Sequence, residues 1–273
     1  MKSSLKPLFC TYILCTFICM QLSASRILCL HGGGGSAASL QYQQGMQDLI
    51  AALPDCEFIF ASSPVPGGVW YNGHPGGGKD PTYDPNWADV SVNYLNDFIE
   101  ANGSFDAILG YSQGVPMSLV YLARGNFDFD KVLLFNGYLP TTHMGLMSEI
   151  DANSPYTQSA LIFIAQNDYN FYQIGLEVKT KFTNYTELIS TGAGHALPRA
   201  SDANFQSVVD FLANLDSSGS DTADGSVDSS VNLQTYRLNI LQGDDLNNLQ
   251  IIDTRIIESS LQNQFFRAEL IPE

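Results

Sequence analysis

Six short apolar runs alternate with helical patterns along the chain, and this alternation is the feature that most constrains the fold. The runs occupy residues 26–30, 56–61, 107–109, 131–135, 160–165 and 186–190. The helical patterns, with apolar residues at i, i+3 and i+4, occupy residues 37–53, 88–101, 115–124, 174–182 and 202–215. Continuously apolar strands are typical of a parallel sheet that is covered on both faces. The alternation therefore predicts a doubly wound, mostly parallel α/β sheet, whose functional groups gather at the carboxyl ends of the strands.

The first 25 residues have the layout of a secretory signal peptide. Lys2 and Lys6 precede a 16-residue, mostly apolar run, and the small residues 23–25 follow it. This run is shorter than the roughly 20 residues that a membrane span needs. We therefore expect the secretory pathway or the extracellular space, and no stable membrane insertion once the signal is removed. The alternatives are an uncleaved anchor, or a buried helix in a cytoplasmic protein.

The rest of the chain divides into three predicted segments. Residues 26–215 carry the strand–helix alternation, 216–231 form a flexible acidic linker of Ser, Asp and Gly, and 232–273 are a C-terminal extension of unknown role. Within the extension, two apolar patterns stand out: Tyr236, Leu238 and Ile240 alternate like a strand, whereas Leu246, Leu249, Ile252 and Ile256 are spaced like a helix. Residues 62–86 form a segment that is long for a strand–helix connection, and we expect this segment to lie over the functional groups at the carboxyl ends of the strands.

Charge and cysteine usage exclude several classes of function. The formal net charge of −16 argues against binding to nucleic acid and disfavours polyanionic substrates such as coenzyme A thioesters. Signal removal would leave Cys29 and Cys56 of the five cysteines, too few for a disulfide framework, so we expect inert core thiols. Two sequons, at Asn102 and Asn184, are potential glycosylation sites in a secreted protein.

The motif with the clearest chemistry is Gly110-Tyr111-Ser112-Gln113-Gly114, a G-x-S-x-G sequence between a predicted strand and a predicted helix. Such a nucleophile elbow forces the serine into a strained conformation and lifts its hydroxyl above the sheet. The glycines on either side allow neighbouring elements to approach closely. We therefore predict that Ser112 is a catalytic nucleophile.

A serine nucleophile requires a base and an orienting carboxylate. Of four histidines, His195 lies in a glycine-rich loop after the last predicted strand, and Asp168 follows the strand before it. Asp151 and Asp130 are weaker rivals for the acid, because neither directly follows a strand end. The chain order is then serine, aspartate, histidine, which is the order expected for the α/β-hydrolase fold.

Four glycines follow His31 at the end of the first predicted strand. Their N–H groups are suited to form an oxyanion hole together with the N–H of Gln113. Gly33 is the expected donor, Gly34 is the alternative, and His31 is expected to order the loop. A phosphate-binding loop is disfavoured, because the run lacks the Lys-Ser/Thr ending and the downstream acid of such motifs.

The sequence resembles the small serine hydrolases called FSH (family of serine hydrolases), which include the ovarian-cancer-associated protein 2 homologues. The matching pieces lie between about residues 26 and 215: Arg26-Ile-Leu-Cys-Leu-His31-Gly32, the G-x-S-x-G motif, Phe135-Asn136-Gly137-Tyr138-Leu139-Pro140, Asp168, and Gly194-His195-Ala196-Leu197-Pro198. The resemblance implies a compact α/β-hydrolase with a minimal lid that acts on carboxylic esters of modest-sized acyl groups.

We therefore expect hydrolysis of a small-molecule carboxylic ester through an acyl-enzyme on Ser112, with no metal or cofactor. Aromatic residues on the loops at the carboxyl edge suit an apolar acyl or aryl group: Trp70, Tyr71, Tyr138 and Tyr169 are the expected substrate contacts, with Tyr83, Trp87, Phe171 and Tyr172 as further rim residues. The alternatives are a thioesterase, an acyltransferase or a peptidase on the same triad, or a secreted non-catalytic binding module. The sequence leaves the oligomeric state open.

Overall fold

The computed structural model describes residues 24–73, 81–213, 233–242 and 250–260. The chain divides into two units, and the parallel sheet with its helices belongs to one of them. Residues 1–23, which hold nearly all of the predicted signal peptide, lie outside the described residues, as does the predicted linker. Both assignments stay predictions.

The core of the larger unit is a six-stranded parallel sheet in the order β2-β1-β3-β4-β5-β6. The strands are β1 (Ser25–Leu30), β2 (Cys56–Ala61), β3 (Ala107–Tyr111), β4 (Lys131–Phe135), β5 (Ser159–Ala165) and β6 (Tyr185–Ser190). The predicted apolar runs coincide with these strands to within two residues at either end. Because all five pairings are parallel, the carboxyl ends of the strands meet at one edge of the sheet.

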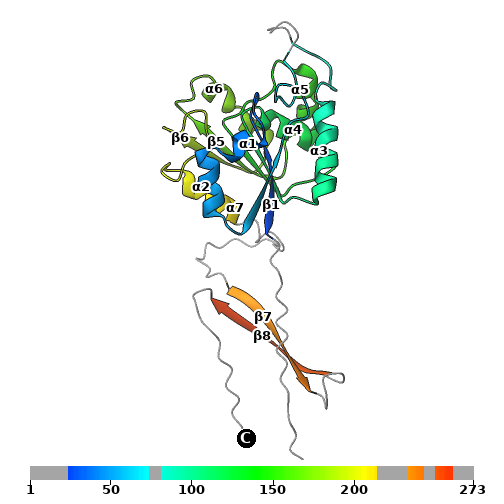
Figure 1. Ribbon diagram of the computed structural model, residues 1–273, viewed down its shortest axis with the longest axis vertical. Coiled ribbons are helices and arrows are strands. Elements are labelled where there is room, and N and C mark those ends of the chain that lie inside the picture. Colours follow the sequence, from blue (N-terminus) through cyan, green and yellow to red (C-terminus); the bar gives the residue numbers. More distant parts are fainter. Residues whose placement is uncertain (1–23, 74–80, 214–232, 243–249, 261–273) are drawn as a thin grey trace, which may run out of the picture. The chain divides into compact units, whose positions relative to one another are not determined.

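Helices cover both faces of the sheet, as Figure 1 shows. One face packs against α3 (Asp89–Asn102), α4 (Gly114–Arg124) and α5 (Met144–Asn153), and the other packs against α1 (Ala37–Gln41), α2 (Gln44–Ala52) and α7 (Phe205–Ala213). Successive strand residues alternate between the two cores: Leu28 and Leu30 face the first, whereas Ile27 and Cys29 face the second. This two-sided burial explains why the strands are continuously apolar, and it confirms the doubly wound prediction.

Two predicted helices are interrupted in the structure. The segment 37–53 forms α1 and α2 rather than one helix, and 174–182 holds only α6 (Tyr172–Gly175) and the 3-10 turn η1 (Val178–Lys181). The predictions of single helices there were wrong. Apolar spacing indicates which face of a segment is buried, but it does not show whether the helix continues without a break. Helix α5, between β4 and β5, was not predicted; it lies beside α4 (Figure 1).

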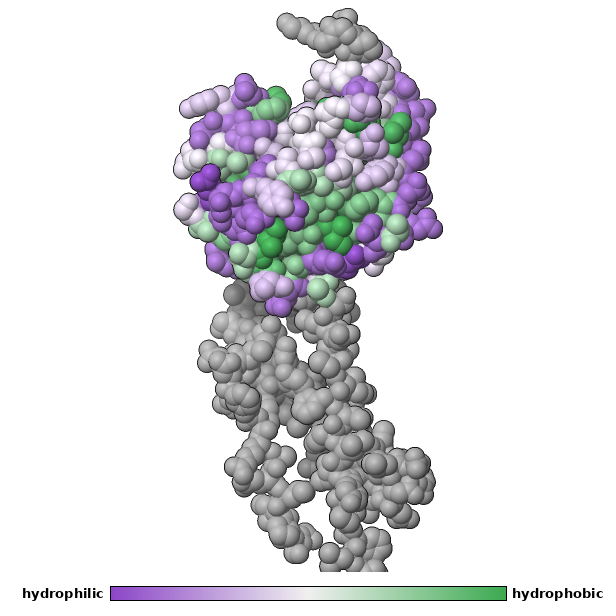
Figure 2. All heavy atoms as spheres, viewed as in Figure 1, coloured by the Kyte–Doolittle hydropathy of each residue, from purple (hydrophilic) through white to green (hydrophobic). Residues whose placement is uncertain are grey.

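Strand β2 forms an edge of the sheet, and its apolar residues before Ala61 are half-buried. Figure 2 shows hydrophobic surface on the side of the molecule between α2 and α3, with hydrophilic residues around it. Among the described residues, no helix has the length and hydropathy to cross a bilayer.

The second unit contains an antiparallel hairpin of β7 (Leu233–Gln242) and β8 (Gln250–Ser260). The strand predicted from Tyr236, Leu238 and Ile240 is confirmed. The helix predicted from Ile252 and Ile256 is wrong, since both residues lie in β8. Residues four positions apart lie on the same face of a strand as well as of a helix, so their spacing does not distinguish the two. The residues of β8 include many with β-branched side chains, which favour strands. Leu246 and Leu249 lie outside the described residues.

Candidate active site

Ser112 lies in the sharp turn between β3 and α4 and has a left-handed backbone, with φ 52°. Its N–H donates to the Phe135 carbonyl oxygen at 3.0 Å, which ties the turn to the end of β4. A Cβ at Gly110 would lie 2.6 Å from the Gly114 carbonyl oxygen, so this position accepts only glycine. The local backbone therefore has the form expected of a nucleophile elbow.

The hydroxyl of Ser112 starts a chain of two hydrogen bonds. His195 Nε2 lies 2.9 Å from Ser112 Oγ, and His195 Nδ1 lies 2.6 Å from Asp168 Oδ2. A carboxylate can only accept, so Nδ1 carries the proton and Nε2 accepts from the serine hydroxyl. The Asp168 side chain is 4% exposed and that of His195 is 33% exposed. The acid is thus shielded from water, whereas the imidazole is accessible to a substrate.

The three side chains come from the ends of three different strands. Ser112 follows β3, Asp168 lies in the turn after β5, and His195 lies in the loop after β6. The structure brings these residues together as the sequence predicts. The two rival acids lie elsewhere, because Asp130 precedes β4 at the opposite edge of the sheet and Asp151 pairs with Lys181 at 2.6 Å.

The glycine run after β1 borders the nucleophile. The Gly34 N–H donates to the Gly68 carbonyl oxygen at 2.8 Å, which leaves this predicted alternative donor occupied. The N–H groups of Gly33 and Gln113, by contrast, donate to no other residue in the part of the chain that the structure describes. A Cβ on Gly33 would lie 3.1 Å from the Gln113 side-chain oxygen, so the two residues are immediate neighbours. Both predicted donors are therefore available beside Ser112.

Buried polar contacts hold the glycine run in place. His31 Nδ1 donates to the Gly32 carbonyl oxygen at 2.7 Å, and His31 Nε2 accepts from the Ser63 N–H at 3.0 Å. Burial lowers the pKa of His31, which favours this neutral form. The Gln113 side chain accepts from the Trp70 N–H at 3.0 Å and donates to the Tyr71 carbonyl oxygen at 2.9 Å. The loop expected to overhang the site is thus fastened beside it, and His31 orders the loop.

The predicted substrate contacts lie at different depths. Trp70 and Tyr71 are 0% and 3% exposed, and the Trp70 indole donates to the His31 carbonyl oxygen at 2.7 Å. The prediction that they lie at the rim was wrong, because both residues are buried and their backbone groups are hydrogen-bonded to the Gln113 side chain. Tyr169 is 90% exposed, so little of it is covered by the fold.

Tyr138 and Phe171 form an aromatic stack that leads to the histidine. The Tyr138 and Phe171 ring centroids lie 5.5 Å apart, and the Phe171 and His195 centroids lie 4.5 Å apart with an interplanar angle of 21°. Phe171, which the sequence identified only as a rim residue, thus contacts the proposed base directly. The stack is a flat apolar surface next to the reacting atoms.

Two asparagines and a tyrosine contact the backbone around His195. Asn136 and Asn167 bind the neighbouring peptide groups, and Tyr111 donates its hydroxyl to the His195 carbonyl oxygen at 2.7 Å. Sequence reasoning assigned no role to either asparagine. The available signal was their position, since polar side chains directly after buried strands lie at the carboxyl edge.

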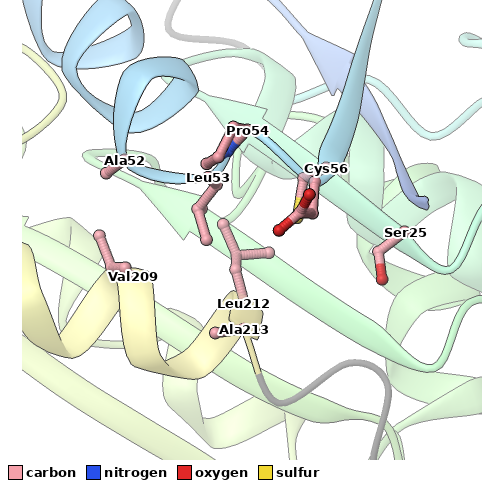
Figure 3. Close-up of a pocket in the computed structure, with 9 residues that line it drawn as sticks. Ser25, Ala52, Leu53, Pro54, Cys56, Val209, Leu212 and Ala213 are labelled. Atoms are coloured by element: carbon pink, nitrogen blue, oxygen red, sulfur yellow. The ribbon is translucent and has the colours of Figure 1, made fainter. Parts of the chain in front are cut away.

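No metal or second catalytic centre is evident in the described segments. They contain no group of three or more His, Cys, Asp or Glu side chains arranged to hold a metal ion. A pocket at the opposite edge of the sheet, where β1 and β2 begin, contains no histidine (Figure 3). It is lined by Ser25, Ala52, Leu53, Pro54, Asp55, Cys56, Val209, Leu212 and Ala213. Burial of Cys29 raises the pKa of its thiol, as expected for an inert core cysteine.

Two solved structures with a similar fold are esterases. The chain is similar to esterase PE8, with a TM-score of 0.54 and 20% identity over 71% of this chain and 93% of that one. It is also similar to a carboxylesterase from Bacillus cereus, with a TM-score of 0.53 and 17% identity over 71% of this chain and 89% of that one. At these identities the likeness shows the shared fold.

Sequence comparison identifies the family. A stretch of 109 residues is 35% identical to esterase alnB of Emericella nidulans, and it spans 38% of this chain and 38% of that protein. Residues 20–206, more than half of the chain, match the family described as serine hydrolase (FSH1). The chain therefore belongs to the serine hydrolase (FSH1) family and has the α/β-hydrolase fold.

Proposed function

We propose that the protein hydrolyses carboxylic esters through an acyl-enzyme on Ser112, with His195 as the base and Asp168 as the acid. The observation that carries this proposal is the unbroken hydrogen-bond chain from Ser112 Oγ to His195 Nε2, at 2.9 Å, and from His195 Nδ1 to Asp168 Oδ2, at 2.6 Å. A neutral serine is a weak nucleophile, and this arrangement supplies the base that activates it.

In the acylation step, the Ser112 oxygen attacks the ester carbonyl carbon while its proton passes to His195 Nε2. Asp168 holds the imidazole in the correct tautomer and stabilises the imidazolium that forms. The N–H groups of Gly33 and Gln113 stabilise the negative charge on the former carbonyl oxygen. His195 then donates its proton to the departing alcohol, which leaves the acyl group on Ser112.

Water completes the reaction. His195 removes a proton from the water as its oxygen attacks the acyl carbon, and then returns the proton to Ser112 as the acid is released. The His195 side chain is 33% exposed, so water reaches it without any movement of the described chain.

The substrate expected at this site is a soluble ester with an apolar or aryl group of modest size. The stack of Tyr138 and Phe171 provides a flat apolar surface that ends on His195. We assign the substrate contact to Tyr138 and Phe171, whereas Trp70 and Tyr71 are buried and their backbone groups hold the Gln113 side chain.

A fluorophosphonate probe tests the nucleophile, because it labels only activated serines. We expect a single adduct on Ser112, located by mass spectrometry, and no adduct in Ser112→Ala or His195→Ala. Ser148→Ala is the matched control, since Ser148 is exposed on α5 and bonds only the Met144 carbonyl oxygen. A folded protein that neither labels nor cleaves p-nitrophenyl esters would contradict the proposal and favour a non-catalytic binding role.

A further inference from the structure

His195 lies on a loop whose own backbone does little to fix the imidazole. Residues 191–201 form turns and irregular structure between β6 and α7, and Gly194, directly before the histidine, has φ 63°. Such glycine-rich backbone has many accessible conformations. The 2.6 and 2.9 Å contacts of the imidazole require one of them, so groups outside the loop must select it.

Asn136 binds the backbone carbonyl groups of the residues on both sides of the histidine. Its Nδ2 donates to the Ala196 carbonyl oxygen at 2.6 Å and to the Gly194 carbonyl oxygen at 3.2 Å. Its Oδ1 accepts from the Ala165 N–H at 2.8 Å, at the end of β5 and three residues before Asp168. One buried side chain thus links the loop that carries the base to the strand that carries the acid.

The contacts of Asn136 leave its amide with one possible orientation. The Ala165 N–H can only donate and the two carbonyl oxygens can only accept, so oxygen and nitrogen of the amide cannot exchange places. Asn136 is 1% exposed and adopts a left-handed backbone, with φ 46°, a conformation that asparagine tolerates better than other residues with a side chain. Asparagine therefore meets the backbone and the hydrogen-bonding requirements of this position together.

Asn167 makes a second link between the same two loops. Its Oδ1 accepts from the Gly194 N–H at 2.8 Å, and it directly precedes Asp168 in the chain. Asn136 and Asn167 together bind the N–H and the carbonyl of Gly194 and the carbonyl of Ala196. These groups belong to the two residues adjacent to His195, so they restrict the backbone from which its side chain projects.

We propose that Asn136 and Asn167 are positioning residues that hold the His195 imidazole in line between Asp168 and Ser112. The inference rests on the ester hydrolysis proposed above, and neither asparagine contacts the reacting atoms itself. Loss of these contacts lets the imidazole move, and a displacement of about 1 Å at a reacting group costs about 100-fold in rate.

The test compares Asn136→Gly and Asn167→Ala with the wild-type protein. Glycine at position 136 keeps the left-handed backbone unstrained and removes only the amide. We expect kcat for a p-nitrophenyl ester to fall by roughly 10- to 100-fold in Asn136→Gly and by several-fold in Asn167→Ala, each with KM nearly unchanged. In proton NMR, the downfield resonance of His195 Nδ1–H against Asp168 is expected to broaden or disappear in Asn136→Gly.

Asn96→Ala is the matched control for a merely structural asparagine. Asn96 Oδ1 accepts from the Tyr121 hydroxyl at 2.7 Å and from the Asn126 N–H at 3.0 Å, and it lies on α3, outside the proposed machinery. This variant should lower Tm while kcat and the downfield resonance stay at their wild-type values.

The inference is overturned if Asn136→Gly and Asn167→Ala keep the wild-type kcat and resonance. It is also overturned if they lose activity only in proportion to their unfolded fraction. If Asn136→Gly does not fold, Asn167→Ala alone tests the inference, because Asn167 is only half-buried. Loss of kcat in Asn167→Ala then supports the inference, and a wild-type kcat contradicts it. A wild-type protein without any hydrolysis would contradict the proposed function instead, and the NMR comparison would still test the positioning.

Discussion

The strained backbone of Ser112 leads to an unusual order of stability among its variants. Ser112 has φ 52°, and for a residue with a Cβ the left-handed conformation costs roughly 1–2 kcal/mol. Glycine has no such cost. Ser112→Ala and Ser112→Gly both remove the hydroxyl and its hydrogen bond to His195, so the two variants differ in whether the strain is kept.

The expected difference follows from two opposing contributions. Release of the strain stabilises Ser112→Gly relative to Ser112→Ala by roughly 1–2 kcal/mol. The greater freedom of glycine in the unfolded chain offsets about 0.4–1 kcal/mol of this gain. The net advantage of the glycine variant lies between about 0 and 1.6 kcal/mol and centres on about 0.8 kcal/mol, which corresponds to about 2–3 °C in Tm for a domain of this size.

Thermal and urea unfolding of both variants measure this difference, and neither variant should hydrolyse esters. The control pair is Ser148→Gly and Ser148→Ala, because Ser148 lies within α5, where alanine is favoured over glycine by about 1 kcal/mol. We expect the order of stability at position 148 to be the reverse of that at position 112. If alanine is at least as stable as glycine at both positions, the argument from backbone strain is refuted.

Two further predictions concern the acid and the glycine loop. Asp168→Asn should lower kcat by about 10⁴-fold without loss of fold, because the amide favours the wrong tautomer of His195; steady-state kinetics and circular dichroism check this. The lowered pKa of His31 means that the unfolded chain binds the proton more readily, so stability is complete above the ordinary pKa of 6.5 and declines as pH falls below it. In urea unfolding, His31→Gln should flatten this acid-side decline, and an unchanged decline would contradict the role of His31.

The strands and the order of the proposed triad were predictable because local sequence encodes them. A strand buried on both faces must be apolar along its length, as 131–135 is, and a nucleophile elbow needs glycines at fixed offsets from its serine. The carboxyl-edge rule then places Ser112, Asp168 and His195 near one another without any knowledge of the packing.

The spacing of apolar residues gave wrong predictions where two different structures produce the same spacing. Ile252 and Ile256 share a face in a helix and in a strand, and only the pairing of β8 with β7 distinguishes the two. The single helix predicted over 37–53 was wrong for a related reason, since the apolar face continues across the break between α1 and α2.

The sequence by itself therefore predicted the doubly wound sheet and the three residues of the proposed triad, all from short-range patterns. Tertiary structure alone decided that Trp70 is buried against Gln113 and His31, and that Phe171 stacks on His195. It also decided that, within the described residues, the Gly34 N–H is bonded to Gly68 whereas the Gly33 N–H is not bonded. It also brought Asn136 to its partners at Gly194 and Ala196, which are 58 and 60 residues away in the chain. The physical reason is that hydrogen bonds and ring contacts depend on distances between side chains and backbone that only the packed fold brings together.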